Sequence, residues 1–476
     1  MTESQASSPR AGWLARLDLD RFDRLVWITI IGLILAIGAV ALGGDRVGVY
    51  VAENGYEPMG AAGGSLPVRV RFSDDMNAES VAEHFHITPD VPGDLTWVSP
   101  SLMIFTPRQP WQAGETYTVT LDAGAQSARR GAVLHDPLTW SFTVRLPRAV
   151  YIAPSDAFTR NLYMTDLDTG DVFQLTTADY GIEDFAVSPN GSEIAYAQNN
   201  EDGTADLWVL NVLTNAPRQV TNCVDAVCRD PAWKPDGAVL AYQREELNTG
   251  LGTGVSPARV WLVDLNSLQT QLLFDDSQIL GYDPTWDASG ERIAVFDSTL
   301  PGIRVHDYAR GSDTVIESMQ GVVGAFSPGE DLLVYPVLVA GAIGQQFYTH
   351  LELADFDAGT TSPISGDAAA PVEDGSAIWS PDGTQLLVAR RYLDGRYTPG
   401  KQLYLLDPAT GDATPLVIDS TYNHAAMHFD ASGTRIVFQR FALQDPDAQP
   451  EIWMLDLNTN AIRKLADNAF LPDWVP

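Results

Sequence analysis

The chain has 476 residues, which is more than one ordinary hydrophobic core accommodates and predicts two or three domains. Apolar residues make up 45% of the sequence and aromatic residues 9%, so disorder is excluded for the bulk of the chain. The formal net charge of -33 argues against nucleic acid as a partner, because phosphate binding needs basic patches. The 39 glycines and 30 prolines favour a turn-rich, all-β protein.

The N-terminal residues predict a membrane anchor. Residues 25–44 carry no charge, and a helix of that length spans the hydrocarbon core, which is about 30 Å thick. Four arginines lie in residues 1–24 and Arg46 stands alone after the run, which places the N-terminus in the cytoplasm. We therefore predict a cytoplasmic tail over 1–24, an uncleaved single-pass transmembrane helix (a signal anchor) over 25–44 in the cell membrane, and an extracytoplasmic remainder. A signal peptide cleaved near Ala39-Val40-Ala41 is the alternative.

Residues 50–147 form short runs of alternating apolar and polar residues, separated by turn residues. Four such runs lie at 68–72, 102–107, 116–121 and 139–144. Their spacing predicts a small β-sandwich. His84 and His86 share one face of a further predicted strand, but they lack additional metal ligands, so we interpret them as surface residues.

Several motifs in this segment resemble bacterial Ig-like domains of the SbsA type. They are FSDDMN at 72–77, ITPDVPG at 87–93, FTPRQPWQAGETYTVTL at 105–121, Gly131 and WSFTV at 140–144. The resemblance covers nearly the whole segment and implies an Ig-like spacer or adhesion module rather than an enzyme.

An aromatic residue, a tight turn and a β-branched run recur through the rest of the chain, residues 148–476. The clearest copy, WSPDGTQLLVAR, runs from Trp379 to Arg390. Looser copies begin at Val187, Trp233, Trp286, Phe326 and Phe429, and an incomplete copy starts at Trp474. A repeat of about 40 to 50 residues predicts a propeller or solenoid, because neighbouring units cover one another's apolar faces.

Each repeat continues into a hairpin, as in LWVLNV and IWMLDL, with Asp, Asn and Gly at the turns. Seven hairpins occur, but only six complete first halves precede them. Ala149–Ala153, before the first hairpin, matches a second strand, whereas Asp473–Pro476 matches an inner strand without a blade. We therefore predict a closed ring of seven four-stranded blades in which Asp473–Pro476 supplies the innermost strand of the first blade.

The repeat resembles the WD40-like propeller repeats of the TolB type. Its Pro-Asp-Gly turn is kept at 235–237 and 381–383, drifts to Pro-Asn-Gly at 189–191, and becomes Ala-Ser-Gly in two blades. The turn is one residue short at 327–330, so six blades are the alternative to seven. The α/β domain of TolB-type proteins is not visible here, since the Ig-like segment occupies its place, and a role in the Tol-Pal system is not implied.

Motifs for catalysis and metal binding are incomplete. No Gly-x-Ser-x-Gly elbow is followed by helix-strand alternation, so no catalytic residues are predicted. His424 and His428 have zinc-protease spacing, but Ala425 stands where that motif needs a glutamate. The runs at Asp166–Asp171 and Asp355–Gly359 resemble parts of a calcium loop but occupy ordinary turn positions. We predict no metal or other cofactor, with calcium as the alternative.

Cys223 and Cys228 are the two cysteines of the chain, and we expect them to form a disulfide in the loop that enters the third blade.

Loop length indicates the binding face. Loops from second to third strands open on the same face as loops between blades, and three are long: Gln243–Arg259, Ala389–Lys401 and Gln439–Glu451. Long loops on a rigid scaffold favour binding, and Arg and Tyr are favoured interface anchors. The predicted ligand-binding residues are Arg244, Arg390, Arg391, Tyr392, Arg396, Tyr397 and Arg440. Simple balancing of nearby carboxylates by these arginines is the alternative.

The sequence thus predicts a membrane-anchored binding or scaffold protein that presents a propeller face, on an Ig-like stalk, to a protein, peptide or glycan. It predicts no enzymatic activity. One alternative is a carbohydrate- or peptide-active enzyme that uses carboxylates in the propeller's central funnel. The other is a surface sensor or regulatory subunit that signals through the N-terminal tail.

Overall fold

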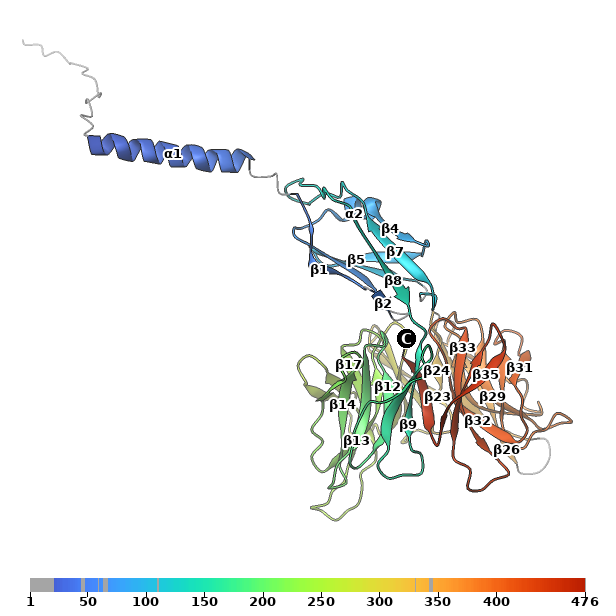
Figure 1. Cartoon of the computed structure of the whole chain (residues 1–476). Helices are drawn as coiled ribbons and strands as arrows, with labels where there is room; N and C mark the ends of the chain where they lie inside the picture. Colours follow the sequence, from blue (N-terminus) through green and yellow to red (C-terminus); the bar gives the residue numbers. More distant parts are fainter. Residues whose placement is uncertain are drawn as a thin grey trace, which may run out of the picture.

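Figure 1 shows a computed structural model of the chain, with a helix, a β-sandwich and a larger β-domain in sequence order. The structure describes residues 21–43, 48–58, 60–62, 67–108, 111–329, 331–341 and 346–475. Residues 1–20 of the predicted tail, Gly44 of the predicted anchor and Pro476 of the predicted closing strand lie outside the described residues.

Helix α1 (Arg21–Gly43) forms over the predicted apolar segment. Large apolar side chains between Leu25 and Leu35 are exposed, among them Ile28 at 70%. Within the described part of the chain, however, no helix combines the length and apolar character needed to cross a membrane. The transmembrane assignment stays a prediction.

Two four-stranded sheets form the β-sandwich and confirm its prediction. Their strand orders are β1-β3-β6-β5 and β2-β8-β7-β4. The strands are β1 (Val51–Glu57), β2 (Gly60–Ala62), β3 (Val68–Phe72), β4 (Phe85–Thr88), β5 (Gly93–Ser99), β6 (Leu102–Pro107), β7 (Thr116–Leu121) and β8 (Leu138–Val144). Trp111 is buried between the sheets, where its ring contacts those of Phe105, Tyr117 and Phe142.

The predicted strand face shared by His84 and His86 is wrong. Helix α2 (Ala78–His84) occupies this segment because the Asn77 side chain caps it, accepting a hydrogen bond from the Ser80 backbone N–H at 3.1 Å. His84 ends the helix, whereas His86 lies on β4 and faces Asp122 at 3.3 Å. The two imidazoles therefore belong to different elements.

Seven antiparallel groups of four strands make up the larger domain, five as separate sheets and two joined in one sheet. Each group is called a blade and numbered in chain order, and its strands are given from the inner to the outer one. Blade 1 contains β36 (Phe470–Val475), β9 (Arg148–Ala153), β10 (Asn161–Asp166) and β11 (Val172–Gln174). Blade 2 contains β12 (Ile182–Val187), β13 (Glu193–Asn199), β14 (Ala205–Asn211) and β15 (Ala216–Gln219).

In each of the other five blades, the four strands follow one another in sequence order from the inner to the outer strand. Blade 3 contains β16 (Ala226–Trp233), β17 (Val239–Glu246), β18 (Arg259–Asp264) and β19 (Thr270–Leu272). Blade 4 contains β20 (Gly281–Trp286), β21 (Arg292–Asp297), β22 (Gly302–Asp307) and β23 (Ser312–Glu317). Blade 5 contains β24 (Ala325–Phe326), β25 (Leu332–Ala340), β26 (Phe347–Asp355) and β27 (Thr360–Pro363). Blade 6 contains β28 (Val372–Trp379), β29 (Leu386–Tyr392), β30 (Gln402–Leu406) and β31 (Ala413–Val417). Blade 7 contains β32 (Tyr422–Phe429), β33 (Arg435–Ala442), β34 (Glu451–Asp456) and β35 (Ala461–Asp467).

The last described residues complete blade 1, as predicted. Strand β36 pairs antiparallel with β9, with Trp474 opposite Ala149 and Val475 opposite Arg148. Trp474 is 4% exposed, and its indole N–H donates to the His428 carbonyl in blade 7 at 3.1 Å. The C-terminal strand therefore joins blade 1 to blade 7.

Two other tryptophans make the same contact between neighbouring inner strands. Trp233 donates to the Ala186 carbonyl and Trp379 to the Ala325 carbonyl, each at 3.0 Å. The recurring aromatic residue of the repeat thus acts between blades, and it satisfies a buried carbonyl in doing so.

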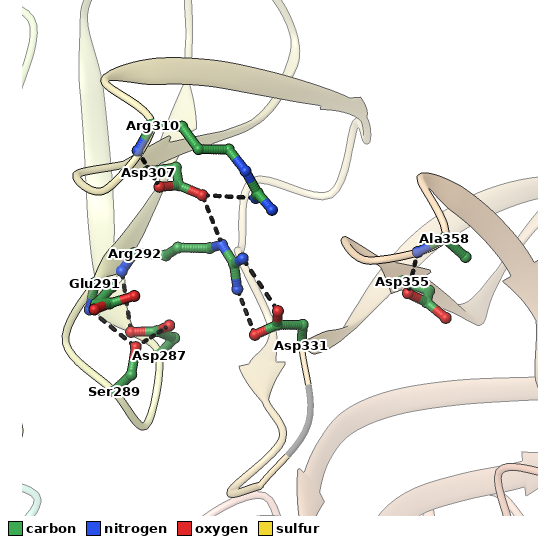
Figure 2. Close-up of polar contacts among 9 residues, drawn as sticks. All are labelled: Asp287, Ser289, Glu291, Arg292, Asp307, Arg310, Asp331, Asp355 and Ala358. Atoms are coloured by element: carbon green, nitrogen blue, oxygen red, sulfur yellow. Dashed lines mark hydrogen bonds and ion pairs between the residues drawn. The ribbon is translucent and has the colours of Figure 1, made fainter.

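Drift of the turn motif preserves its hydrogen bonds. In the Pro-Asp-Gly turn, Ser380 donates to Asp382 at 2.6 Å and accepts from the backbone N–H of Gln385. In an Ala-Ser-Gly turn the two side chains exchange places, so Ser289 donates to Asp287 at 2.7 Å (Figure 2). Asp287 then accepts from the backbone N–H of Arg292, five residues on, as Ser380 does from Gln385. The two motifs therefore form the same turn, with Ser and Asp at exchanged positions.

Acidic residues at the ends of third strands cap the next turn. Asp166 accepts from the backbone N–H groups of Asp168 and Thr169, and Asp355 accepts from that of Ala358 (Figure 2). These contacts are the turn-stabilising bonds typical of Asp and Asn. They support the interpretation of both runs as plain turns.

An ion-pair network joins blades 4 and 5. Figure 2 shows Arg292 donating to Asp307 of its own blade at 3.2 Å and to both oxygens of Asp331 in the next blade, at 2.5 and 3.1 Å. The Arg292 side chain is 10% exposed, and its paired donors offset the cost of burying the charge.

Replacing Trp474→Ala removes a buried ring and the bond to His428, so we expect the free energy of unfolding to fall by about 3–5 kcal/mol. Leu471→Ala, at a 38% exposed position of the same strand, is the control and should cost far less. Thermal unfolding followed by circular dichroism measures both. Equal losses would contradict closure by β36.

Ser380→Asp places two carboxylates in one turn and should destabilise the chain by about 1–2 kcal/mol. Adding Asp382→Ser recreates the arrangement of Asp287 and Ser289 and should restore the melting temperature. A double variant no more stable than the single one would show that the two turn motifs are not equivalent.

Candidate binding face of the propeller

Strand polarity divides the propeller into two faces. β9 begins at Arg148, soon after the Ig-like domain ends at Val144, and Arg148 pairs with Val475. Loops from second to third strands leave the opposite ends of the blades, together with loops between blades. These loops form the loop face. It points away from the Ig-like domain, and Figure 1 shows long loops extending from that end of the propeller.

A pocket of about 330 Å³ lies toward the loop face between blades 6 and 7. Its side chains come from the starts of β28 and β32, the end of β29 and the loop before β30. The lining residues are Glu373, Gly375, Ser376, Ala389, Arg391, Lys401, Asn423, His424 and Ala425. Two cations therefore share this pocket with one carboxylate, in a chain whose net charge is -33.

His424 is fully buried beside this pocket and is neutral. Its Nδ1 lies 3.1 Å from the Lys401 carbonyl, which only accepts, so Nδ1 carries the hydrogen. Nε2 then presents a lone pair, and no hydrogen-bond donor reaches it among the described residues. Burial lowers the pKa of His424 to about 4, although its bond to the Lys401 backbone raises it.

Arg390, one of the predicted ligand-binding residues, is buried. Its guanidinium donates to both oxygens of Asp374 at 2.6 and 2.8 Å, and Asp374 also accepts from the Ser365 hydroxyl. Arg390 and Asp374 are cross-strand partners in blade 6, and Arg390 is 3% exposed. Its positive charge is therefore neutralised by Asp374 inside blade 6.

The other predicted arginines also pair with carboxylates. Arg391 donates to Glu373, and Arg396 donates to Asp394 while lying 3.5 Å from the centre of the Tyr392 ring. Tyr392 is 8% exposed and Tyr397 is 57% exposed. The geometry favours the carboxylate-balancing interpretation, and a ligand role for these residues stays a prediction.

Arg244 and Arg440 repeat the pattern in blades 3 and 7. Arg244 donates to Glu246 at 2.7 Å, and Arg440 lies 3.5 Å from Glu451. The Arg440 guanidinium is also held against the Tyr422 and Trp453 rings, at 3.9 and 3.7 Å from their centres.

Exposed apolar side chains gather on the loop face, and sequence reasoning identified only Tyr397 among them. Thirteen large ones lie in its loops or adjoining strand ends: Phe158, Val224, Leu251, Val255, Leu300, Met319, Val322, Leu338, Phe347, Tyr397, Ile418, Leu443 and Leu471. By the same criterion the opposite face carries five among the described residues: Leu213, Leu268 and Tyr308 in turns, and Val172 and Ile462 at adjoining strand ends. Most of these residues stand in loops without a periodic pattern, whereas Leu338 lies in the apolar run of β25.

Three partly buried aspartates connect the inner strands of blades 2 to 4 to the blade that follows each of them. Asp184 accepts from the Asp230 backbone N–H at 2.9 Å, Asp230 accepts from that of Asp283, and Asp283 accepts from that of Val323 at 2.6 Å. Each lies at a bulge of its strand. Burial, and next the neighbouring aspartate, raise the pKa of Asp184 to about 7 and that of Asp230 to about 6.

The predicted disulfide is present, and it joins Cys223, in the loop that enters blade 3, to Cys228 on β16 rather than within the loop alone. The Cys223 backbone N–H also donates to Asp206 at 2.7 Å, which holds the loop against blade 2. Across the part of the chain that the structure describes, no three His, Cys, Asp or Glu side chains are placed to hold a metal ion.

Comparison with known proteins gives one family match, and it covers the β-sandwich. A family model described as a bacterial Ig-like domain matches residues 58–144. No curated protein matches the chain. TolB from Acinetobacter baumannii is 14% identical over 83% of each chain, with a TM-score of 0.43.

Two further solved structures are similar to this chain. An oligogalacturonate lyase in complex with manganese is 16% identical over 68% of this chain and 85% of its own, with a TM-score of 0.48. The β-propeller domain of the Trilobed protease from Pyrococcus furiosus is 14% identical over 60% and 82%, with a TM-score of 0.44. Likenesses this weak carry no argument about activity. The strand topology and the Ig-like match together establish a propeller preceded by an Ig-like domain.

Asp184→Asn should stabilise the chain at pH 8. The folded pKa of Asp184 is raised from 3.8 to about 7, so stability falls as the pH rises through this window. The amide keeps an oxygen for the Asp230 N–H and removes the charge. We expect a melting temperature about 2–4 °C higher at pH 8 and no gain at pH 4. Asp168→Asn, at an exposed turn, is the control; a gain independent of pH would contradict the assignment.

Proposed function

We propose that this chain is a binding and scaffold protein whose seven blades close into a rigid propeller and present the loop face to a protein partner. The observation that carries the proposal is the concentration of exposed apolar side chains on that face. Exposed apolar groups on a folded surface mark interaction sites, because leaving them in water is unfavourable.

The chemistry of the face favours protein over glycan. Most of the exposed side chains are aliphatic or Met, and the aromatic ones, Phe158, Phe347 and Tyr397, stand on three different blades. Aliphatic, Met and aromatic contacts surrounded by polar loops are typical of protein interfaces.

The proposal includes an extracytoplasmic location with the cell membrane as anchor. The uncharged segment 25–44, the arginines before it and the exposed apolar side chains of α1 support this placement. The loop face, opposite the attachment point of the Ig-like domain, would then be presented away from the membrane.

The enzymatic alternative rests on the three inner-strand carboxylates with raised pKa values. Each of them, however, accepts a backbone N–H from the next blade, and this gives it a structural role. A binding function therefore accounts for more of the observed geometry.

Leu251→Ser, Met319→Ser and Phe347→Ser, combined in one full-length variant, should reduce partner capture at least tenfold. The control combines Leu213→Ser, Leu268→Ser and Tyr308→Ser on the opposite face and should capture normally. Affinity capture from envelope extract with quantitative mass spectrometry measures both, and melting temperatures verify folding. Equal capture by the two variants would exclude the loop face. Arg390 is left unchanged, since its substitution would bury an unpaired Asp374.

A further inference from the structure

The pocket between blades 6 and 7 holds side-chain donors that make no hydrogen bond among the described residues, although Lys401 forms an ion pair with Glu373. Lys401 Nζ lies 3.7 Å from Glu373, beyond hydrogen-bond distance, whereas Arg391 already donates to that carboxylate. Asn423 uses its carbonyl oxygen to accept from the Lys401 backbone at 2.9 Å, which directs its amide N–H groups elsewhere. The Lys401 side chain is 27% exposed, so its ammonium remains accessible.

The charge of the pocket selects an anion of a particular kind. Arg391 and Lys401 contribute two positive charges and Glu373 one negative charge, which leaves a single positive charge. A monoanion neutralises the site, whereas a phosphate dianion leaves excess negative charge in a strongly acidic protein. A carboxylate is the common monoanion that suits an ammonium and amide donors.

His424 adds a complementary requirement. Its Nε2 is a buried acceptor without a donor among the described residues, and Nδ1 is committed to the Lys401 carbonyl. An unpaired buried acceptor is unfavourable, and a ligand N–H or O–H would relieve it. Because Lys401 holds both the ammonium and the carbonyl that orients His424, one residue positions both halves of the site.

We propose that this pocket binds a carboxylate that carries an amide N–H nearby, as at the free C-terminus of a polypeptide. The carboxylate contacts Lys401 and Asn423, and the amide N–H donates to His424 Nε2. Because Nε2 has no exposed surface in this structure, binding requires the side chains that line the pocket to move aside. The inference rests on the proposed binding function and specifies the chemical group that a protein partner inserts into the loop face.

N-acetylglycine is the minimal probe, because it has a carboxylate and an adjacent amide N–H. N-acetylglycinamide lacks the charge, and acetate lacks the donor. We expect the full-length chain to bind N-acetylglycine with a dissociation constant of about 1 mM by calorimetry, at least tenfold more tightly than either control probe. Equal binding of the acid and the amide would overturn the proposal without any substitution being needed.

Lys401→Met should weaken N-acetylglycine binding at least tenfold, and Lys401→Arg should restore most of it. Lys464→Met removes a lysine that pairs with Glu451 and Asp467 elsewhere in blade 7 and serves as the matched control. In heteronuclear spectra, N-acetylglycine should shift the His424 Nε2 resonance, and acetate should leave it unchanged. Undiminished binding by Lys401→Met, or an unmoved Nε2 signal, would refute the site.

Different experimental results would contradict the carboxylate site and the proposed binding function. If N-acetylglycine does not bind while the loop-face variant still loses its partner, the carboxylate site is wrong and the proposed function stands. If N-acetylglycine binds as expected but the loop-face variant captures partners normally, the site stands as a small-carboxylate site and the proposed function is wrong.

Discussion

Pairing between β36 and β9 is the constraint on which the rest of the molecule depends. It brings residues from the end of the chain into the first blade and joins blade 1 to blade 7 through Trp474 and His428. Without that pairing, β9 would expose an unpaired edge and the inner strand of blade 1 would be absent. Closure also fixes which strand ends face the Ig-like domain, and therefore which loops point away from it.

Contacts between blades explain why this scaffold is rigid. Indole N–H groups of Trp233, Trp379 and Trp474 reach carbonyls of the preceding blade. Aspartates of blades 2 to 4 accept backbone N–H groups from the following blade. Burial of these carboxylates costs stability at neutral pH, since they retain protons more strongly when folded. Under the proposed function, the partner is recognised by the loops, because the ring does not fix their conformations.

The arginines of the predicted binding face mostly form ion pairs with carboxylates of the same chain. The five arginines that were predicted to bind a ligand pair with carboxylates, and two of them, Arg390 and Arg440, are at least nine-tenths buried. Such pairs satisfy groups that would be costly to bury alone, and they contribute little attraction for a ligand. The pocket between blades 6 and 7 differs because Lys401 stands outside hydrogen-bond reach of its carboxylate. Under the proposed carboxylate binding, a ligand neutralises the single positive charge that remains in this pocket.

Repetition in the sequence determined the propeller, because seven hairpins and six first halves leave one missing strand that only the chain end can supply. Exchange of Ser and Asp between turn motifs was invisible in the sequence, since the pairing of Asp287 with Ser289 appears only when the turn is folded. Helix α2 was missed because its seven residues are too short for a periodic pattern. The loop-face side chains and the Lys401–His424 pocket were decided by tertiary structure alone. The loop-face side chains come from blades far apart in the chain, and packing of the blades places them on one face. The pocket forms between the consecutive blades 6 and 7, where His424 packs against the Lys401 carbonyl.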